Sequence, residues 1–337
     1  PSSVRVMVSA DEPLMDRSLR CAAFGRARVL RRETRPGRIA KQPSRSQHFA
    51  VTGAMPPAPT SSEPLGIIAG GGPLPFDVAT AAHRQGRAVF VVGLEGFVDA
   101  ERVASWPNRV LRVGAIGAIL AELRAHDCRD LVMIGTVRRP GLRDLRPDAT
   151  GLRIVAKLGK AFFGGDDGLL AGLVRLLGEE GFRVVGAHDI VGDLLAPSGV
   201  LTHTEPDDTA RADIARGIVV ARALGAVDVG QGCVVQQGFV LAVEAVEGTD
   251  AMLARCAGLA RSGVGGVLVK LVKPGQERRA DLPTVGVETV RGAAAAGLRG
   301  IAYEAGGTLL ANRDAAVAAA NAAGLFLIGI DPKDQST

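Results

Sequence analysis

A dense set of charged and amide side chains follows an apolar run in VKLVKPGQERRADLPTVG, from Val269 to Gly286. The side chains in it that can bind a ligand or take part in catalysis are those of Lys270, Lys273, Gln276, Arg278, Arg279 and Asp281. Cations in such a loop can neutralise a diphosphate, and one carboxylate can hold a metal ion or direct a water molecule. Loops at the carboxyl ends of strands in open α/β sheets bind ligands, so the stretch predicts a ligand site. The alternative is a solvated loop with ordinary surface charges.

A second polar stretch, VEAVEGTDAML, lies upstream of this loop. Glu244, Glu247, Thr249 and Asp250 can face the same cleft. Capping of the next helix by Thr249 is the default explanation of the stretch.

Two adjacent carboxylates, Asp166 and Asp167, stand behind two glycines in GGDDGLL. Carboxylates at a helix start cap free amides and are stabilised by the helix dipole, which explains the pair structurally. The same pair offers hard oxygen ligands for Mg²⁺. Both interpretations stay open.

The glycine-rich loop AGGGPLP joins an apolar run to a helix-like segment. Gly70, Gly71 and Gly72 let the backbone approach a phosphate, which free amides at a helix start can bind. Pro75 at the first helical position suits this geometry, but it takes the place of the third glycine of a dinucleotide fingerprint. Glu95 falls near the position of the ribose-binding acid of an NAD site. A nicotinamide dehydrogenase and a purely structural turn are both candidates.

The elements that would position these residues alternate between strand-like and helix-like segments from Leu65 onward. The apolar runs LGIIA, AVFVVG, RVLRVG, DLVMIG and FRVVGA are interleaved with FDVATAAHRQG, IGAILAELRAH and DGLLAGLVRLLGEEG. This order predicts a parallel sheet covered by helices on both faces. We therefore expect an α/β protein with a Rossmann-like first domain over residues 63–192.

A second, separate α/β domain is expected over residues 207–332, after a Pro- and Gly-containing linker at 193–206. Its first helix, DDTARADIARGIVVARALG, has Asp207 or Asp208 in place as the N-cap. The segment GCVVQQGFVLAVEAVEG predicts a hairpin or two closely spaced strands. A ligand cleft is expected between the two domains.

The N-terminal segment is basic and has no steady apolar period. Residues 1–60 carry eleven basic and four acidic side chains, so the net charge of +5 arises there and the rest of the chain is near neutral. The near-neutral remainder of the chain lacks the excess of basic residues that is typical of nucleic-acid-binding proteins. A basic arm for anionic surfaces and a disordered extension both fit the composition. We favour a disordered extension over residues 1–62, with the native start at Met55 as a further interpretation.

Four widely spaced cysteines favour reduced thiols in a cytoplasmic protein and argue against a zinc site. They are Cys21, Cys128, Cys233 and Cys256, and the last three lie among apolar residues and are expected to be buried. No apolar run approaches the ~18–20 residues of a membrane span, and the first sixty residues lack the apolar core of a secretory signal.

Several long blocks carry a family resemblance. They are GIIAGGGPLP, GGDDGLL, DVGQGCVVQQGFVLAVEAVEGTDAML, KPGQERRADLPTVGVETV and GLFLIGID, in order from about Leu65 to Pro332. The chain resembles the LpxI family, the UDP-2,3-diacylglucosamine diphosphatases of bacterial lipid A synthesis. The resemblance implies cleavage of UDP-2,3-diacylglucosamine to UMP and 2,3-diacylglucosamine 1-phosphate, with Mg²⁺ and with water entering at the sugar-side phosphorus. It also implies two α/β domains, the lipid product between them, and a homodimer.

The resemblance extends to individual residues. The family's catalytic aspartate stands in the motif that is RADLPTVG here, which implies that Asp281 is catalytic. Expected ligands of Mg²⁺, with Mn²⁺ as a substitute, are Asp281, Asp166 and Asp167. Expected substrate contacts are Gly70, Gly71, Gly72, Gln231, Thr249, Lys270, Lys273, Gln276 and Thr284. Gly164 and Gly165 stand where Lys or Arg often precedes the paired aspartates, which leaves no cation at that spot.

Two functions from other classes compete with this hypothesis. An NAD(P)-linked reductase built on the first domain would bind nicotinamide dinucleotide and transfer hydride. A non-catalytic nucleotide or lipid sensor would bind the UDP-sugar lipid without turnover. The sequence resembles only the diphosphatase throughout, so we expect a cytoplasmic enzyme with peripheral contact to the inner membrane and no nucleic-acid partner.

Overall fold

The computed structural model describes most of the 337-residue chain, over residues 63–138, 146–159 and 166–333. The expectations for residues 1–62, including the start at Met55, lie outside the described residues. The side chains of Asp166 and Asp167 lie outside them as well.

The first sheet consists of five parallel strands in the order β3-β2-β1-β4-β5. The strands are β1 (Leu65–Ala69), β2 (Val89–Leu94), β3 (Asn108–Leu111), β4 (Asp130–Ile134) and β5 (Arg183–Val184). At the centre, Leu65 of β1 is in register with Val89 of β2 and Asp130 of β4. The strand order reverses between β1 and β4, which is where doubly wound sheets bind ligands.

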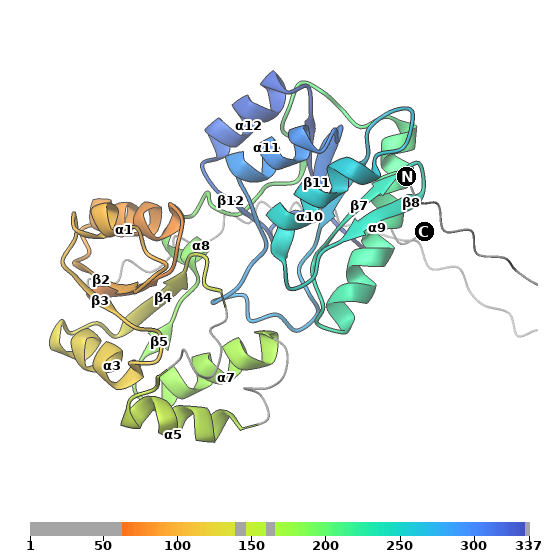
Figure 1. Cartoon of the computed structure of the whole chain (residues 1–337). Coiled ribbons are helices and arrows are strands. Elements are labelled where there is room, and N and C mark those ends of the chain that lie inside the picture. The colour runs from red at the N-terminus through yellow and green to blue at the C-terminus, as the bar shows by residue number, and fades with distance from the viewer. Residues whose placement is uncertain (1–62, 139–145, 160–165, 334–337) are drawn as a thin grey trace, which may run out of the picture. The chain divides into compact units, whose positions relative to one another are not determined.

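Helices cover both faces of this sheet, with α1 on one side and α3 and α7 on the other (Figure 1). The helices are α1 (Leu74–Arg84), α2 (Ala100–Val103), α3 (Ile116–Ala125), α5 (Ala149–Leu158), α7 (Asp166–Glu179) and α8 (Ala187–Ile190). Along β2, Val91 packs in the cluster of α1 and α8, whereas Phe90 and Val92 pack in the cluster of α3 and α7. This period of two places apolar side chains on both faces of a buried strand.

The second sheet is mixed and has the strand order β6-β13-β11-β9-β7-β8. Its strands are β6 (Gly199–Val200), β7 (Gly232–Gln236), β8 (Phe239–Val243), β9 (Val267–Lys270), β11 (Gly300–Glu304) and β13 (Phe326–Ile330). β9, β11 and β13 are parallel, and β6, β7 and β8 join by antiparallel pairing. The predicted hairpin is β7–β8, and its turn residues Gln237 and Gly238 have φ of 51° and 80°, as a tight hairpin turn requires.

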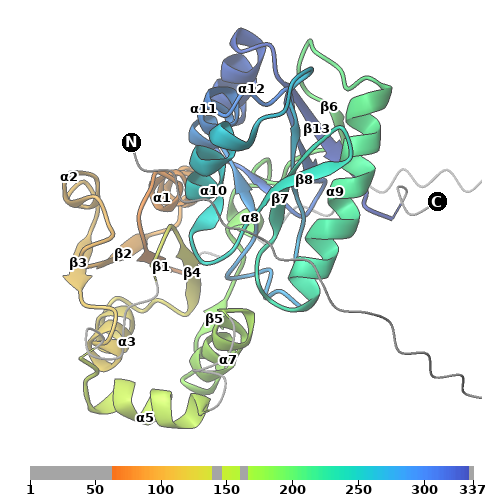
Figure 2. The same ribbon diagram turned by 45° about the vertical axis from the view of Figure 1, so that its right-hand side comes forward.

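Three helices cover one face of the second sheet and one long helix covers the other (Figure 2). They are α10 (Gly248–Cys256), α11 (Val287–Ala295) and α12 (Arg313–Ala322) on one face, and α9 (Asp208–Ala226) opposite. Leu268 and Ile301 face the three helices, whereas Val269 and Ala302 face α9. α9 approaches β9 closely at Gly217, because a Cβ there would collide with the Val269 side chain.

The expected linker at 193–206 is partly built into the second sheet. A small parallel pair, β10 (Thr284–Val285) and β12 (Leu309–Leu310), lies beside it. Leu195 forms an antiparallel bridge to Leu309, and β6 pairs with β13. The boundaries of the two domains stay a prediction.

Several expectations about the fold are confirmed. The protein is α/β, with a parallel Rossmann-like first sheet and a second sheet of its own. Asp207 caps α9, since its carboxylate accepts a hydrogen bond from the Ala210 amide at 2.8 Å. α1 begins at Leu74, so Pro75 occupies the second helical position rather than the first.

The three described cysteines are buried free thiols, as predicted. Burial raises the pKa of the Cys128 thiol to about 11 and that of the Cys233 thiol to about 12. Burial also raises the pKa of Cys256. All three thiols are therefore protonated near neutral pH and act as packing residues.

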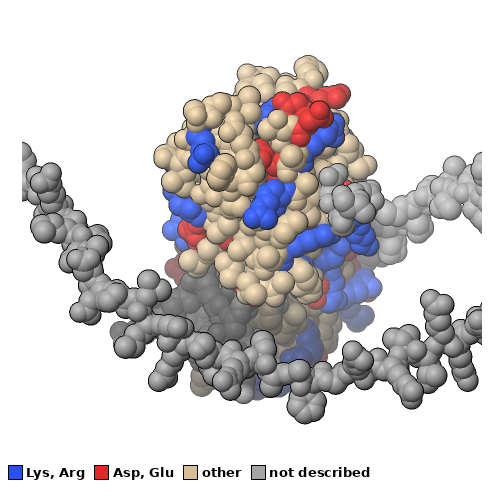
Figure 3. All heavy atoms as spheres, turned by 90° about the vertical axis from the view of Figure 1, so that its right-hand side faces the viewer, with Lys and Arg blue, Asp and Glu red and all other residues tan. Residues whose placement is uncertain are grey.

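Charged side chains of both signs occur on the face shown in Figure 3, scattered among uncharged residues. This distribution agrees with the near-neutral composition of the chain after residue 60. Within the described ranges, no helix combines the length and the apolar character needed to cross a membrane.

Candidate active site

Asp281 lies in the loop between β9 and β10, directly before the buried residues Leu282 and Pro283. Its backbone amide donates to the Glu277 carbonyl at 2.9 Å, and the residue is half-buried. Leu282 belongs to the hydrophobic cluster on one face of the first sheet, whereas Ala280 packs against the cluster on the opposite face. Residues 280–284, here called the Asp281 segment, therefore contact the hydrophobic clusters on both faces of the first sheet.

Gln276 holds the Asp281 carboxylate in place. Its Nε2 donates to Asp281 Oδ2 at 2.6 Å and to Gln231 Oε1 at 3.3 Å. Its Oε1 accepts a hydrogen bond from the Lys273 backbone amide at 3.0 Å. A backbone amide only donates, so the Gln276 oxygen must face Lys273 and its NH₂ group must face Asp281. Asp281 Oδ1 has no hydrogen-bond partner among the residues that the structure describes.

Lys270, the last residue of β9, is buried and hydrogen-bonded within the protein. Its Nζ donates to Thr249 Oγ1 at 2.7 Å and to the Thr284 carbonyl at 3.2 Å. Thr249 Oγ1 in turn donates to Glu244 Oε1 at 2.6 Å. Lys270 is 4% exposed and Glu244 is 6% exposed. Three of the predicted substrate contacts, Lys270, Thr249 and Thr284, thus meet at one buried ammonium group.

The expectation that Thr249 caps the next helix is wrong. α10 begins at Gly248, and Glu247 before it makes no side-chain cap. Thr249 lies in the first turn, where the Lys270 ammonium and a carboxylate occupy its hydroxyl. Glu247 pairs with Arg255 at 2.8 Å. The Thr249 hydroxyl therefore bonds to the buried Lys270 ammonium and to Glu244, and it does not cap the helix.

The other cations of the loop also have partners within the protein. Lys273 Nζ pairs with Asp228 Oδ1 at 2.7 Å, just beyond the end of α9. Arg278 donates to a backbone carbonyl at 2.5 Å, and Arg279 pairs with Glu277 at 2.7 Å. The hydrogen bond from Arg279 lowers the pKa of Glu277 against the opposing effect of burial. The solvated-loop alternative therefore suits the two exposed arginines but not Lys273, whose side chain is 9% exposed.

The glycine loop after β1 is tied to the loop after β4. The Gly70 amide donates to the last carbonyl of β4, and Gly71 and Thr136 exchange two backbone hydrogen bonds, all at 2.9 Å. A Cβ on Gly70 would lie 2.8 Å from the Gly135 backbone, so a side chain cannot fit there. Gly72 has a φ of 88°, which favours glycine. These contacts give the glycines a structural role, and their contact with a phosphate stays a prediction.

One metal ligand can be assessed from the described side chains. Among them, no group of three or more His, Cys, Asp and Glu residues could hold a metal ion. Mg²⁺ is typically held by one or two carboxylates together with substrate phosphates and water. The free Oδ1 of Asp281 fits such a shared site, in which a phosphate-bearing ligand would supply further oxygens. The expected ligands Asp166 and Asp167 lie outside the described side chains.

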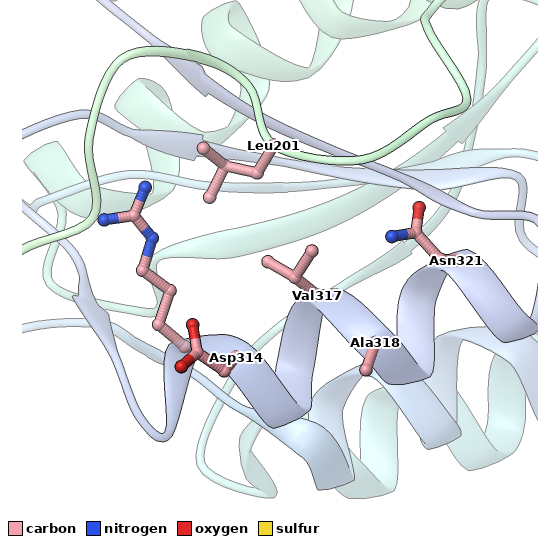
Figure 4. Close-up of a pocket in the computed structure, with 6 residues that line it drawn as sticks. Leu201, Asp314, Val317, Ala318 and Asn321 are labelled. Carbon is pink, nitrogen blue, oxygen red and sulfur yellow. The ribbon is translucent and has the colours of Figure 1, made fainter.

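A pocket of about 400 Å³ lies along α12 and involves none of these residues. Val317, Ala318 and Asn321 line its helical wall, and Leu201 lies across from them (Figure 4). The pocket brings together no predicted site residue, so the candidate site stays with the Asp281 segment.

The sequence allows Glu244 to face the cleft, but Glu244 is not among the expected substrate contacts. It follows β8 and lies over Gly232 of β7, where a Cβ would come within 2.8 Å of Glu244 Oε2. A Cβ on Gly230 would collide with the Glu244 carbonyl. The signal in the sequence that could have indicated this position of Glu244 is the pair of glycines in Gly230-Gln231-Gly232, because glycine in a strand often marks a close approach of a neighbouring chain segment.

Comparison with known proteins covers both sheets and the Asp281 loop. The LpxI N-terminal domain profile matches residues 64–194, and the LpxI C-terminal domain profile matches residues 197–328. The chain is 44% identical over 277 residues to the UDP-2,3-diacylglucosamine pyrophosphatase LpxI of Caulobacter vibrioides, covering 80% of this chain and 99% of that relative. The chain belongs to the LpxI family.

Proposed function

We propose that this protein hydrolyses the diphosphate bond of UDP-2,3-diacylglucosamine and so releases UMP and 2,3-diacylglucosamine 1-phosphate for lipid A synthesis. Family membership over both domains and the pyrophosphatase relative support the proposal. The observation that carries it is the Asp281 carboxylate, which is held at one oxygen and free at the other.

Asp281 is the proposed catalytic residue. With Oδ2 held by Gln276, the free Oδ1 keeps one orientation at the half-buried end of the loop. An ionised carboxylate either accepts a proton or binds a cation, so Oδ1 can act in one of two ways: it takes the proton of an attacking water molecule, or it holds the metal ion that directs that water. In this step the water oxygen bonds to the sugar-side phosphorus, the bond from that phosphorus to the bridging oxygen breaks, and UMP leaves with the bridging oxygen.

A Mg²⁺ ion, with Mn²⁺ as a substitute, is part of the proposal. Asp281 would hold it together with phosphate oxygens of the substrate, because the described side chains form no metal cluster of their own. When bound, the ion would neutralise charge on the diphosphate and favour the approach of a nucleophile. Asp166 and Asp167 stay candidates for the same ion.

The remaining predicted contacts divide into two groups. Gln231, Thr249, Lys270, Gln276 and Thr284 form hydrogen-bonded chains that end at or beside the Asp281 segment. We propose that their effect on the substrate passes largely through that segment. The glycine loop and Lys273 are proposed to contact the nucleotide directly.

Product identification tests the proposal. Purified protein incubated with UDP-2,3-diacylglucosamine and Mg²⁺ should release UMP and 2,3-diacylglucosamine 1-phosphate in equal amounts, as measured by chromatography and mass. In ¹⁸O-labelled water the label should enter the lipid monophosphate. Release of UDP, or label in UMP, would contradict the proposed bond cleavage. Binding without turnover would favour the sensor, and oxidation of a reduced nicotinamide would favour the reductase.

The chemistry of the substrate also bears on location. Its acyl chains place it at a lipid surface, so we propose peripheral contact of a cytoplasmic protein with the inner membrane. A homodimer is proposed from the family resemblance.

A further inference from the structure

A buried chain of three side chains connects the residue after β8 with α10 and β9. Glu244 Oε1 accepts from Thr249 Oγ1 at 2.6 Å, and Thr249 Oγ1 accepts from Lys270 Nζ at 2.7 Å. The carboxylate and the ammonium are both more than nine-tenths buried. Glu244 and Thr249 are five residues apart in the sequence, and Lys270 lies 21 residues beyond Thr249. The antiparallel pairing of β7 with both β8 and β9 brings the end of β8 close to Lys270.

The direction of each hydrogen bond in the chain is determined by chemistry. An ammonium group only donates, so the Thr249 oxygen must accept from Lys270. The hydroxyl has one proton, and the acceptor within reach is Glu244 Oε1. The Thr249 hydroxyl is therefore held between a cation and an anion.

The charges explain why the chain needs an acid at its far end. A buried ammonium without an opposite charge is strongly destabilising. The direct partners of Lys270 Nζ are neutral, a hydroxyl and a carbonyl. Among the described residues, the carboxylate linked to it is Glu244, one hydroxyl away. Gly232 leaves the space that this carboxylate occupies.

The other end of the chain reaches the Asp281 segment. Lys270 Nζ donates to the Thr284 carbonyl at 3.2 Å, three residues beyond Asp281. On the near side, Gln276 holds the Asp281 carboxylate at 2.6 Å. The segment is thus fixed at its carboxylate and again at Thr284, and the second attachment is the one that Glu244 stabilises.

We propose that Glu244 is a positioning residue for the reaction, acting through Thr249 and Lys270 to hold the Asp281 segment in its working place. The inference rests on the proposed function, in which Asp281 is the catalytic residue. Glu244 itself touches neither the substrate nor Asp281 in this account. Its loss should therefore reduce kcat through a misplaced Asp281 and change KM little.

Substitutions at Thr249 test the chain directly. Thr249→Val keeps the volume and removes the hydroxyl, and it should lower kcat by at least about tenfold with KM within about threefold. Thr249→Ser restores the hydroxyl and should recover kcat to within about threefold of the parent. Thr308→Val is the matched control, because Thr308 is fully buried and its hydroxyl has no partner among the described residues. The control should leave kcat unchanged.

Combination with Asp281→Ala separates positioning from general structural support. If the chain acts by placing Asp281, Thr249→Val should lower the residual turnover of Asp281→Ala by less than about twofold. A further tenfold loss in that background would overturn the inference, as would equal activity of the Val and Ser variants. Parent-like activity of Asp281→Ala would instead refute the proposed function, and the inference with it.

Glu244→Gln provides a second variant that keeps the shape and the acceptor for Thr249. We expect it to fold, to lower kcat with KM nearly unchanged, and to speed amide hydrogen exchange in the peptide that contains Asp281 to Val285. Unchanged kcat together with unchanged exchange in that peptide would contradict the role of the buried charge.

Discussion

Replacing Gln276 by leucine should impair catalysis more than it impairs folding. The substitution introduces an apolar side chain of similar size at a position that is 7% exposed. It removes the NH₂ group that donates to Asp281 Oδ2 at 2.6 Å and the oxygen that accepts from the Lys273 amide at 3.0 Å. The Asp281 carboxylate then loses its one side-chain hydrogen bond among the described residues.

The size of the effect follows from the type of bond that is lost. A hydrogen bond to a charged group contributes about 1.5–3 kcal/mol. If the whole amount holds the carboxylate in its reactive orientation, kcat falls by about 10- to 150-fold, since each 1.36 kcal/mol is a factor of ten. Loss of the acceptor for the Lys273 amide hydrogen bond costs about 1–3 kcal/mol of stability. We therefore expect Tm to fall by several degrees while the protein stays folded.

Gln236→Leu is the matched control for this experiment. Gln236 is 1% exposed and makes three hydrogen bonds with the backbone of Arg261 and Val264. Its loss should destabilise the protein comparably, yet it holds no part of the Asp281 segment. Steady-state UMP release at saturating substrate, together with thermal unfolding of both variants, provides the comparison.

Two results would refute this reasoning. One is a kcat for Gln276→Leu within about twofold of the parent, which would mean that the Asp281 orientation does not depend on this bond. The other is an equal loss of kcat in Gln236→Leu, which would mean that the loss follows general destabilisation.

Three further predictions concern stability, metal and chain length. Asp130→Asn should lower the free energy of unfolding by about 3–5 kcal/mol with kcat unchanged, because it removes the negative charge that pairs with the buried Arg87 at 2.9 Å. Burial raises the pKa of Asp130, but hydrogen bonds from Arg183 and Arg87 outweigh it and hold the pKa below its usual value. The stabilisation by the Asp130 carboxylate is therefore complete above its unfolded pKa of about 3.9 and is lost as the pH falls through its lower folded pKa. The variant lacks this stabilisation, so its acid unfolding, monitored by circular dichroism, should begin at higher pH than that of the parent. Excess EDTA should abolish UMP release and added Mg²⁺ or Mn²⁺ should restore it; undiminished turnover in EDTA would exclude the metal. A protein beginning at Met55 should retain the turnover and the Tm of the full chain, and a tenfold loss of turnover would assign a role to the basic segment.

The fold could be predicted where the apolar pattern is long. β2 and β4 are buried on both faces, so their runs stand out between helices that repeat an apolar face. β6, β10 and β12 have two residues each, which is too short for a period of two to show. Pairing with neighbouring strands forms them, and that information is absent from the local sequence.

The candidate site divides in the same way. Lys270, Gln276 and Asp281 could be predicted together because one loop carries them directly after a strand. The link from Thr249 to Lys270 depends on the register of antiparallel strands, which local patterns do not encode. Local reasoning therefore made Thr249 a helix cap, whereas the buried ammonium takes its hydroxyl.

The central claim is that the Asp281 carboxylate carries the hydrolysis, and Asp281→Asn tests it most directly. Asparagine keeps the shape and removes the charge, so Gln276 can still donate to its amide oxygen. Release of UMP from UDP-2,3-diacylglucosamine at saturating substrate and Mg²⁺ should fall by about 10²–10⁴-fold, the range for loss of a positioned acid–base or electrostatic group. Tm should stay within a few degrees of the parent, as for a loop residue. Turnover within about threefold of the parent in the folded variant would contradict the assignment.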